Sequence, residues 1–247
     1  MGKTFDEVVM EELRGTGSLA KKFIVTPFSV LDARHESWGK KQVNWLPVFD
    51  PLLCEIVYLW HMPKRGGSIL DPFGGSTRGI VAGCLGHSYT GIEPNQEQIK
   101  ANERQALLVQ LQYPQMKLPK WICAKPESMD SHLPRGQRYD LIFTSLPIYA
   151  SADATGGYAA RYKNVFAQAI PRLKQNRFVV VMARTVYGDE FIEFSPEQVT
   201  TFVSPTAARY YNRFELVMSG NIHESLVCFF KGKVTRIPEE LGNGAIA

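Results

Sequence analysis

The chain has 247 residues, of which 45% are hydrophobic, and this is enough apolar material for one sizeable folded domain. Such a composition excludes a disordered chain of low hydrophobicity. Lys and Arg outnumber Asp and Glu by 28 to 24, and the resulting net charge of +4 permits a nucleic-acid partner without identifying one.

The four cysteines, at positions 54, 84, 123 and 228, are too widely spaced for a zinc knuckle and too few for a disulfide scaffold. We therefore expect buried thiols in a reducing compartment, and no metal site. The first ten residues lack the apolar core of a secretory signal, and the longest apolar runs are strand-sized. These features predict a soluble, intracellular protein that has no membrane partner.

The N-terminal segment is predicted to be irregular up to one clear helix. Residues 5–13 favour a polar helix, and residues 23–31 mix β-branched and aromatic side chains, which favours an extended stretch. Asp50 and Pro51 predict the start of a helix, because Asp is a good N-cap and Pro is tolerated in the first turn. The apolar side chains of this helix share one face, at Leu53, Ile56, Val57 and Trp60.

From residue 68 onward, short apolar runs alternate with helical stretches, which is typical of βαβ units. Strands are predicted at residues 68–73, 88–93, 121–124, 140–145 and 177–183. Helices are predicted at residues 76–85, 95–112 and 158–173. Residues 150–157 and 184–205 are expected to form loops. The alternation predicts an α/β fold with a doubly wound, mostly parallel sheet.

The C-terminal part of the chain departs from this alternation. Strand-like runs at residues 215–218 and 225–230 are separated by only a few residues, which predicts an antiparallel hairpin at the edge of the sheet. Residues 237–247 are expected to form a flexible tail.

The strongest local signal is an apolar strand that runs into Gly74-Gly75 and then into a helix. Glycines let a ligand approach the backbone, and a helix start offers unpaired N–H groups. Glu93 ends the next strand, about twenty residues later, where doubly wound folds place a carboxylate that binds ribose hydroxyls. The pattern favours a nucleoside cofactor over a phosphate binder. The alternative is an ordinary turn followed by a solvated acid.

Residues 71–77, Asp-Pro-Phe-Gly-Gly-Ser-Thr, resemble the cofactor loop of the S-adenosylmethionine (SAM)-dependent DNA amino-methyltransferases, the adenine-N6 and cytosine-N4 type. Residues 28–32, Phe-Ser-Val-Leu-Asp, resemble the additional cofactor segment that this family has upstream. The likeness is greatest to short phage-type or orphan members, and it extends from residue 23 to residue 233.

This resemblance implies a Rossmann-like methyltransferase fold with a seven-stranded sheet and an antiparallel C-terminal hairpin. It implies a single domain over residues 1–236, with an N-terminal cofactor segment at 23–45 and a core at 50–236. It also implies a location in the cytoplasm of a bacterial or phage-infected cell.

The resemblance assigns SAM to residues from both segments. The ribose is expected to bind Glu93, and Asp32 is expected to reach the methionine end. The cofactor-binding residues implied are Phe28, Ser29, Asp32, Asp71, Pro72, Phe73, Gly74, Gly75, Ser76, Thr77 and Glu93.

The family's catalytic tetrapeptide, an Asp, Asn or Ser followed by Pro-Pro and an aromatic residue, is expected after the fourth strand. Here that position holds Ser145-Leu146-Pro147-Ile148, followed by Tyr149. The chemistry requires oxygen acceptors for the exocyclic amine and an aromatic ring on which the flipped base stacks. Ser145 and the Leu146 carbonyl are the expected acceptors, and Tyr149 would have to supply the ring. The implied catalytic residues are Ser145, Leu146, Pro147 and Tyr149.

A second departure from the family lies at the end of the third strand. The family commonly has an acid there that accepts a hydrogen bond from the adenine amine of the cofactor, whereas this chain has Lys125. Glu127 or Asp130 would have to substitute for that acid.

Two further groups of residues are candidates for contacts with DNA, although each also fits an ordinary structural role. The first could form a basic and aromatic surface for a phosphate backbone or could simply be solvated, and it comprises Arg34, Lys40, Lys41, Arg78, Trp38 and Trp45. The second could contact a flipped strand or pack in the core, and it comprises Tyr158, Arg161, Tyr162 and Lys163.

The sequence thus favours a site-specific, SAM-dependent DNA methyltransferase that transfers a methyl group to adenine N6 or cytosine N4 of a flipped base by direct attack. One alternative is a catalytically inactive protein of the same fold that acts as a DNA-binding or regulatory subunit. A third possibility is that the fold carries out another transfer, on RNA or with a different group. DNA is the expected partner, and a second subunit or a homodimer is a further expectation. The target base and the recognition sequence are left open.

Overall fold

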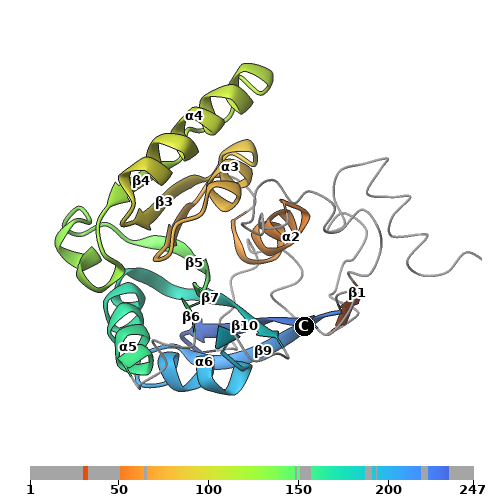
Figure 1. Cartoon of the computed structure of the whole chain (residues 1–247), viewed down its shortest axis with the longest axis vertical. Coiled ribbons are helices and arrows are strands. Elements are labelled where there is room, and N and C mark those ends of the chain that lie inside the picture. The colour runs from red at the N-terminus through yellow and green to blue at the C-terminus, as the bar shows by residue number, and fades with distance from the viewer. Residues whose placement is uncertain are drawn as a thin grey trace, which may run out of the picture.

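The computed structural model describes residues 30–32, 51–63, 66–147, 149–150, 157–186, 191–192, 194–217 and 222–233. Within these residues, eight strands form the central sheet, in the order β1-β9-β10-β7-β5-β2-β3-β4 (Figure 1). In this order they are β1 (Val30–Asp32), β9 (Arg209–Val217), β10 (Ile222–Lys231), β7 (Leu173–Val186), β5 (Tyr139–Ser145), β2 (Ser68–Asp71), β3 (Ser88–Glu93) and β4 (Lys120–Cys123).

The strand directions confirm the predicted fold class. Strands β7, β5, β2, β3 and β4 run parallel to one another, and β10 is antiparallel to both β7 and β9. The C-terminal hairpin is therefore confirmed, with both strands longer than expected. The three-residue strand β1 adds an eighth member to the seven predicted, and it pairs in parallel with β9.

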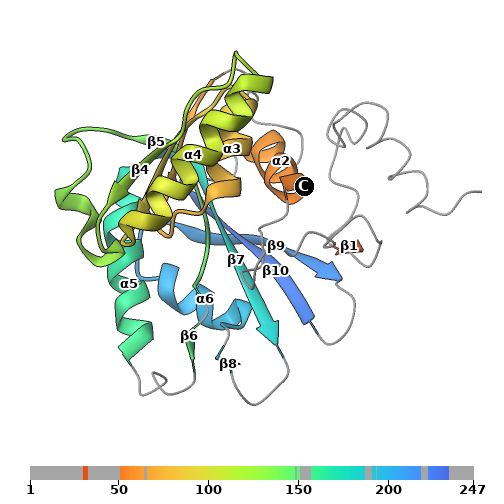
Figure 2. The ribbon, with the colours of Figure 1, turned by 45° about the horizontal axis from the view of Figure 1, so that its top comes forward.

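Helices cover both faces of the sheet (Figures 1 and 2). One face carries α2 (Pro51–His61), α3 (Ser76–Cys84) and α4 (Gln96–Gln112), whose buried side chains belong to one apolar cluster. The other face carries α5 (Gly157–Ala169) and α6 (Pro196–Val203), which belong to a second cluster. The remaining short elements are the 3-10 helices η2 (Pro126–Ser131) and η4 (Ile170–Arg172) and the strand pair β6 (Tyr149–Ala150) and β8 (Phe191–Ile192).

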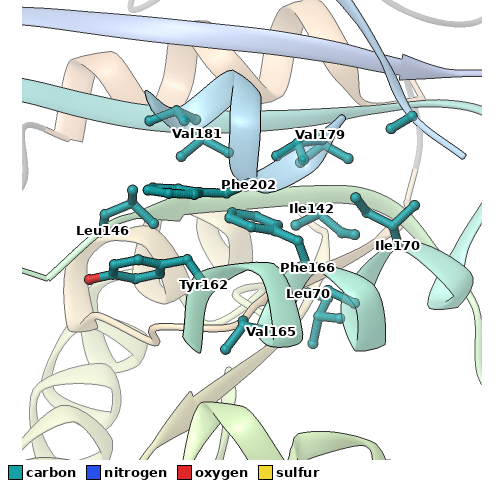
Figure 3. Packing of buried hydrophobic residues seen from close by; sticks show 14 of the residues in the cluster. Leu70, Ile142, Leu146, Tyr162, Val165, Phe166, Ile170, Val179, Val181 and Phe202 are labelled. Carbon is teal, nitrogen blue, oxygen red and sulfur yellow. The ribbon is translucent and has the colours of Figure 1, made fainter. Parts of the chain in front are cut away.

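Alternation along the strands produces the two clusters, because successive side chains point to opposite faces of a sheet. Ile69 and Leu141 belong to the cluster beneath α2, α3 and α4, whereas their neighbours Leu70 and Ile142 belong to the other. Figure 3 shows Leu70 and Ile142 packed with Phe166 of α5. Continuous apolar strands are what a parallel sheet covered on both faces requires.

The boundaries of the predicted elements are confirmed for most of the core, with two corrections. The predicted helix at 158–173 ends at Ala169, since Pro171 has no N–H to continue it, and β7 then begins at Leu173. The predicted loop at 184–205 is wrong, because it contains the end of β7 and the whole of α6. The side chains of Ser195 and Gln198 cap α6 reciprocally, a signal that was readable in the sequence.

Several expectations lie outside the described residues. These are the polar helix at 5–13, the cofactor segment apart from residues 30–32, loop residues 151–156 and the tail at 237–247. No helix among the described residues is long and apolar enough to cross a membrane. The four cysteines are free thiols, of which Cys54 and Cys228 are buried as expected, whereas Cys123 is exposed.

A histidine buried in the first cluster makes the fold sensitive to acid. The His61 ring packs against Phe178 with ring centroids 5.0 Å apart, and Nδ1 lies 2.9 Å from the Val57 carbonyl, to which it donates when it carries the proton. Burial lowers the pKa of His61 from 6.5 to about 4. Between these two values the unfolded chain binds a proton that the folded chain excludes, so stability falls as the pH is lowered through this range.

We predict that His61 accounts for a loss of up to about 3 kcal/mol in unfolding free energy between pH 6.5 and pH 4. Urea denaturation at a series of pH values measures this loss. His61→Phe should show a smaller acid-induced loss than the native chain, while His132→Gln, at an exposed position, should not change it. An unchanged pH dependence in His61→Phe would contradict the prediction.

Candidate functional site

The glycine turn after β2 lies directly against the end of β3. The backbone N–H of Gly74 donates to the Ile92 carbonyl, with an N–O distance of 2.8 Å. A Cβ atom on Gly74 would lie only 2.9 Å from the Cα of Gly91, so this close approach requires glycine. The contact brings the turn next to Glu93, which ends β3.

A buried ion pair between Asp71 and Arg78 holds the backbone of the turn in place. The Asp71 carboxylate is fully buried, and the Nε of Arg78 donates to its Oδ2 at 2.6 Å. It also accepts from the Tyr89 hydroxyl at 2.6 Å and from the Thr144 hydroxyl at 2.7 Å. The backbone N–H of Phe73 completes this set at 3.1 Å. One carboxylate thus joins β2, β3, β5 and α3.

The second arm of Arg78 reaches the turn itself. Its Nη2 donates to the Phe73 carbonyl at 2.7 Å, and its side chain is only 5% exposed. Burial alone would lower the pKa of Arg78, but the Asp71 carboxylate and Tyr89 more than offset this effect, so that the pKa is raised. The interpretation of Arg78 as part of a surface for a phosphate backbone is therefore wrong. The other five residues of that group lie outside the described residues.

Glu93 is the acid that remains accessible beside the turn. Its carboxylate is partly buried, and Oε1 accepts from the backbone N–H of Asn95 at 2.8 Å. Burial raises the pKa of Glu93 above its ordinary value, the Asn95 hydrogen bond opposes this, and the Asp71 charge adds to it. The Asn95 side chain caps α4, so the segment after Glu93 is held at both ends.

The predicted catalytic segment follows β5 at the same edge of the sheet. Ser145 is partly exposed, whereas the Leu146 side chain is buried and its backbone N–H donates to the Met182 carbonyl at 3.5 Å. The Pro147 carbonyl accepts from the Tyr162 hydroxyl at 3.2 Å. Ile148 and the Tyr149 side chain lie outside the described residues.

Tyr162 connects the turn with the catalytic segment. Its ring lies 5.5 Å from that of Phe73 in an edge-on contact, while its hydroxyl binds Pro147. On its other side the ring packs against Phe194 and Phe202, and Figure 3 shows Tyr162 and Leu146 at the same end of the cluster. Tyr158 is buried as well, so the structural interpretation of both tyrosines is confirmed.

The two acids expected to replace the missing family acid are both engaged in ion pairs. Glu127 binds Arg161 with an N–O distance of 2.7 Å, and Asp130 binds Arg172 at 2.7 Å. Lys125 precedes η2 and is exposed. Arg161, one of the candidates for contacts with a flipped strand, is thus paired with Glu127.

The remaining predicted cofactor residues have different placements. Pro72 is buried and Ser76 and Thr77 begin α3, with Gly75 as its N-cap. Gly75 has no side chain to cap the helix, so the first turn of α3 keeps backbone N–H groups for another acceptor. Asp32 ends β1, paired with Val217 of β9, and Phe28 and Ser29 lie outside the described residues.

No family model and no curated protein matches the sequence. TrmN from Thermus thermophilus aligns with a TM-score of 0.58 and 16% identity, covering 74% of this chain and 49% of that one. The chain therefore spans about half the length of that protein. An rRNA methylase from Streptococcus thermophilus aligns with a TM-score of 0.51 and 10% identity, covering 75% of this chain and 99% of that one.

A third structure, magnesium protoporphyrin IX methyltransferase from Synechocystis PCC 6803 with bound SAM, aligns with a TM-score of 0.51. It shares 10% identity, with 93% of this chain and 98% of that chain covered. The second of these proteins is named as an rRNA methylase and the third as a methyltransferase of magnesium protoporphyrin IX, and what they share with this chain is the architecture. The chain therefore has the fold of the SAM-dependent methyltransferases.

We predict that Asp71→Asn lowers the free energy of unfolding by about 3–5 kcal/mol, because it leaves the buried Arg78 guanidinium without its counter-charge. Urea denaturation measures the change. The double variant Asp71→Asn/Arg78→Met should recover part of the loss, since it removes both charges. If Asp71→Asn is as stable as the native chain, the ion pair does not support the turn.

Proposed function

We propose that this protein is a SAM-dependent methyltransferase that methylates the exocyclic amine of adenine or cytosine in DNA. The observation that carries the proposal is the pair of contacts at one edge of the sheet. Gly74 holds the glycine turn against the strand that ends in Glu93, and Tyr162 joins Phe73 of the turn to the Pro147 carbonyl. The cofactor and catalytic segments thereby form one site.

The residues at this edge fit a nucleoside cofactor. The Glu93 carboxylate can accept from ribose hydroxyls, as acids at this position do in doubly wound folds. Gly74 and Gly75 expose backbone beside it, and the uncapped first turn of α3 offers N–H donors to polar groups of the ligand. When bound there, SAM supplies a methyl group that a nucleophilic nitrogen can accept without a covalent enzyme intermediate.

The catalytic segment would orient the accepting amine. The Ser145 hydroxyl and the Leu146 carbonyl accept hydrogen bonds from the two amine hydrogens, which directs the nitrogen lone pair away from them and toward the cofactor side. A base in a duplex reaches this position only after it has been flipped out of the stack. The preference for DNA over RNA rests on the resemblance of residues 28–32 and 71–77 to the DNA amino-methyltransferases.

A second candidate function, an inactive DNA-binding or regulatory subunit of the same fold, has specific observations in its favour. Ile148 stands where the family has an aromatic residue. The family has an acid where this chain has Lys125. The two acids that could substitute for it, Glu127 and Asp130, both form ion pairs with arginines. An inactive subunit would tolerate these changes, because it needs neither an aromatic ring for a flipped base nor an acid for the adenine of the cofactor.

We predict that Glu93→Gln weakens SAM binding by about 10- to 100-fold, the loss expected for hydrogen bonds to a charged acceptor. Isothermal titration calorimetry measures the dissociation constant. Glu97→Gln is the matched control, because Glu97 is an exposed acid in the first turn of α4. Equal affinities of the two variants would remove Glu93 from the cofactor site.

The same residue predicts a pH dependence of SAM affinity. Because burial raises the pKa of Glu93, its carboxylate is protonated at a higher pH than an exposed glutamate, and it then loses acceptor capacity. The affinity of the native chain should therefore fall as the pH is lowered through this raised pKa. Glu93→Gln should bind with an affinity that changes less over that range.

Mass spectrometry of nucleosides tests the proposed reaction. Purified protein is incubated with SAM and double-stranded DNA, and separately with RNA, before digestion to nucleosides. We expect N6-methyladenine or N4-methylcytosine in the DNA, and at least tenfold less in Ser145→Ala at equal SAM affinity. Methylated RNA alone would overturn the choice of DNA, and SAM binding without product would favour the inactive subunit.

A further inference from the structure

Basic side chains gather at the edge of the sheet opposite the candidate site. Arg138 precedes β5, Lys174 and Arg177 lie near the start of β7, and Lys231 ends β10. Strand pairing brings them together, since Tyr139 aligns with Leu173 and Lys231 aligns with Arg177. Arg135 and Lys233 are close to these residues in the sequence. We call the whole set the basic edge: Arg135, Arg138, Lys174, Arg177, Lys231 and Lys233.

Hydrogen bonds to main-chain carbonyls and one carboxylate hold this arrangement in place. Lys231 Nζ donates to the carbonyls of Ile170 at 2.9 Å and Leu173 at 2.6 Å. Asp140 accepts from Lys174 at 2.8 Å and lies 3.4 Å from the Nε of Arg177. Three of the six cations, Lys174, Arg177 and Lys231, are therefore held in place at the strand ends.

The basic edge concentrates the positive charge of the chain. Six cations and one carboxylate, Asp140, give this group a net charge of +5, compared with +4 for all 247 residues. Arg177 is buried, and the exposed members are Arg135, Arg138, Lys174 and Lys233. Burial is the main cause that lowers the pKa of Lys231, and the like charge of the neighbouring Arg138 guanidinium adds to it. A surface of one sign attracts polyanions.

The chemistry of this surface favours a phosphate backbone over a protein partner. The three segments of the basic edge, residues 135–138, 174–177 and 231–233, otherwise contain only glycine and the amide side chains of Gln137, Gln175 and Asn176. Protein interfaces usually have an apolar, aromatic-rich centre, whereas nucleic-acid interfaces are polar and positively charged. Among the residues that the structure describes, the exposed large apolar side chains lie on other segments, at Leu107, Leu108, Leu111, Tyr113, Leu118 and Tyr210.

We propose that the basic edge binds the phosphate backbone of a nucleic acid, as a contact surface separate from the candidate site. Parallel strands place Ser145 and Glu93 at one edge of the sheet and the basic edge at the other. The seven residues of β5 separate the two edges by roughly 23 Å, at about 3.3 Å per residue. The basic edge would therefore hold a different stretch of nucleic acid from the one at Ser145, keeping substrate near the enzyme without reading its sequence.

Fluorescence anisotropy with a labelled 20-base-pair duplex, without SAM and over a series of salt concentrations, tests this proposal. The test variant is Arg138→Gln/Lys233→Gln, and the matched control is Lys100→Gln/Arg104→Gln on α4, which also removes one Lys and one Arg from exposed positions. Thermal melting establishes that both variants are folded. Two duplexes of unrelated sequence are compared.

We expect the test variant to bind both duplexes at least fivefold more weakly. The slope of log affinity against log salt should fall by about two, near 0.9 for each lost phosphate contact. The control should change by less than twofold. Equal losses in the two variants would overturn the proposal, and so would displacement of the duplex by poly-glutamate at equal charge concentration, which would point to an acidic protein.

This outcome is distinguishable from that of the proposed function. SAM affinity of the test variant, measured by calorimetry, should equal that of the native chain. Failure of methyl transfer together with salt-dependent duplex binding through Arg138 and Lys233 would reject the enzyme and retain the basic edge. Methyl transfer by the native chain, together with native duplex affinity in the test variant, would retain the enzyme and reject the basic edge.

Discussion

The architecture of the site depends on one buried ion pair, Asp71 with Arg78. Removing a carboxylate and a guanidinium from water carries a large desolvation cost, which close geometry and further hydrogen bonds must offset. Here the Asp71 carboxylate accepts hydrogen bonds from four donors, one each on β3, β5, α3 and the turn. The Nη2 of Arg78 donates to the Phe73 carbonyl. The shape of the turn is therefore set by buried side chains that do not need to contact a ligand.

This support changes the role of the residues in the glycine turn. Asp71 belongs to the segment that resembles a cofactor loop, yet its carboxylate is fully buried and already engaged. Gly74 lies flat against Gly91, so its missing side chain serves the packing of two strands as well as access to the backbone. What the turn presents to a cofactor is main chain, with Glu93 as the adjacent acid.

The sequence pattern was sufficient for the elements whose periodicity is strong. The apolar face of α2 and the buried strands β2, β3 and β5 were predicted because burial dictates their composition. The sequence does not predict the burial of Arg78, because arginine is mostly exposed and only tertiary pairing with Asp71 explains why this one is buried. The link from Tyr162 to Pro147 likewise depends on the packing of α5, which no local pattern encodes. By contrast, the capping box at the start of α6, formed by Ser195 and Gln198, is a local signal from which the start of this helix can be predicted.

Strand β5 ties the two edges of the sheet together through the polar residues at its ends. Asp140, near its start, is 4% exposed and gathers Lys174 and Arg177, while Thr144, near its end, is fully buried and donates to Asp71. Between them the strand is apolar and lies between β2 and β7 in the middle of the sheet. Hydrogen bonds that involve buried carboxylates hold both ends of β5, and apolar packing holds its centre. The strand therefore connects the proposed nucleic-acid contact at the basic edge with Ser145 at the opposite edge.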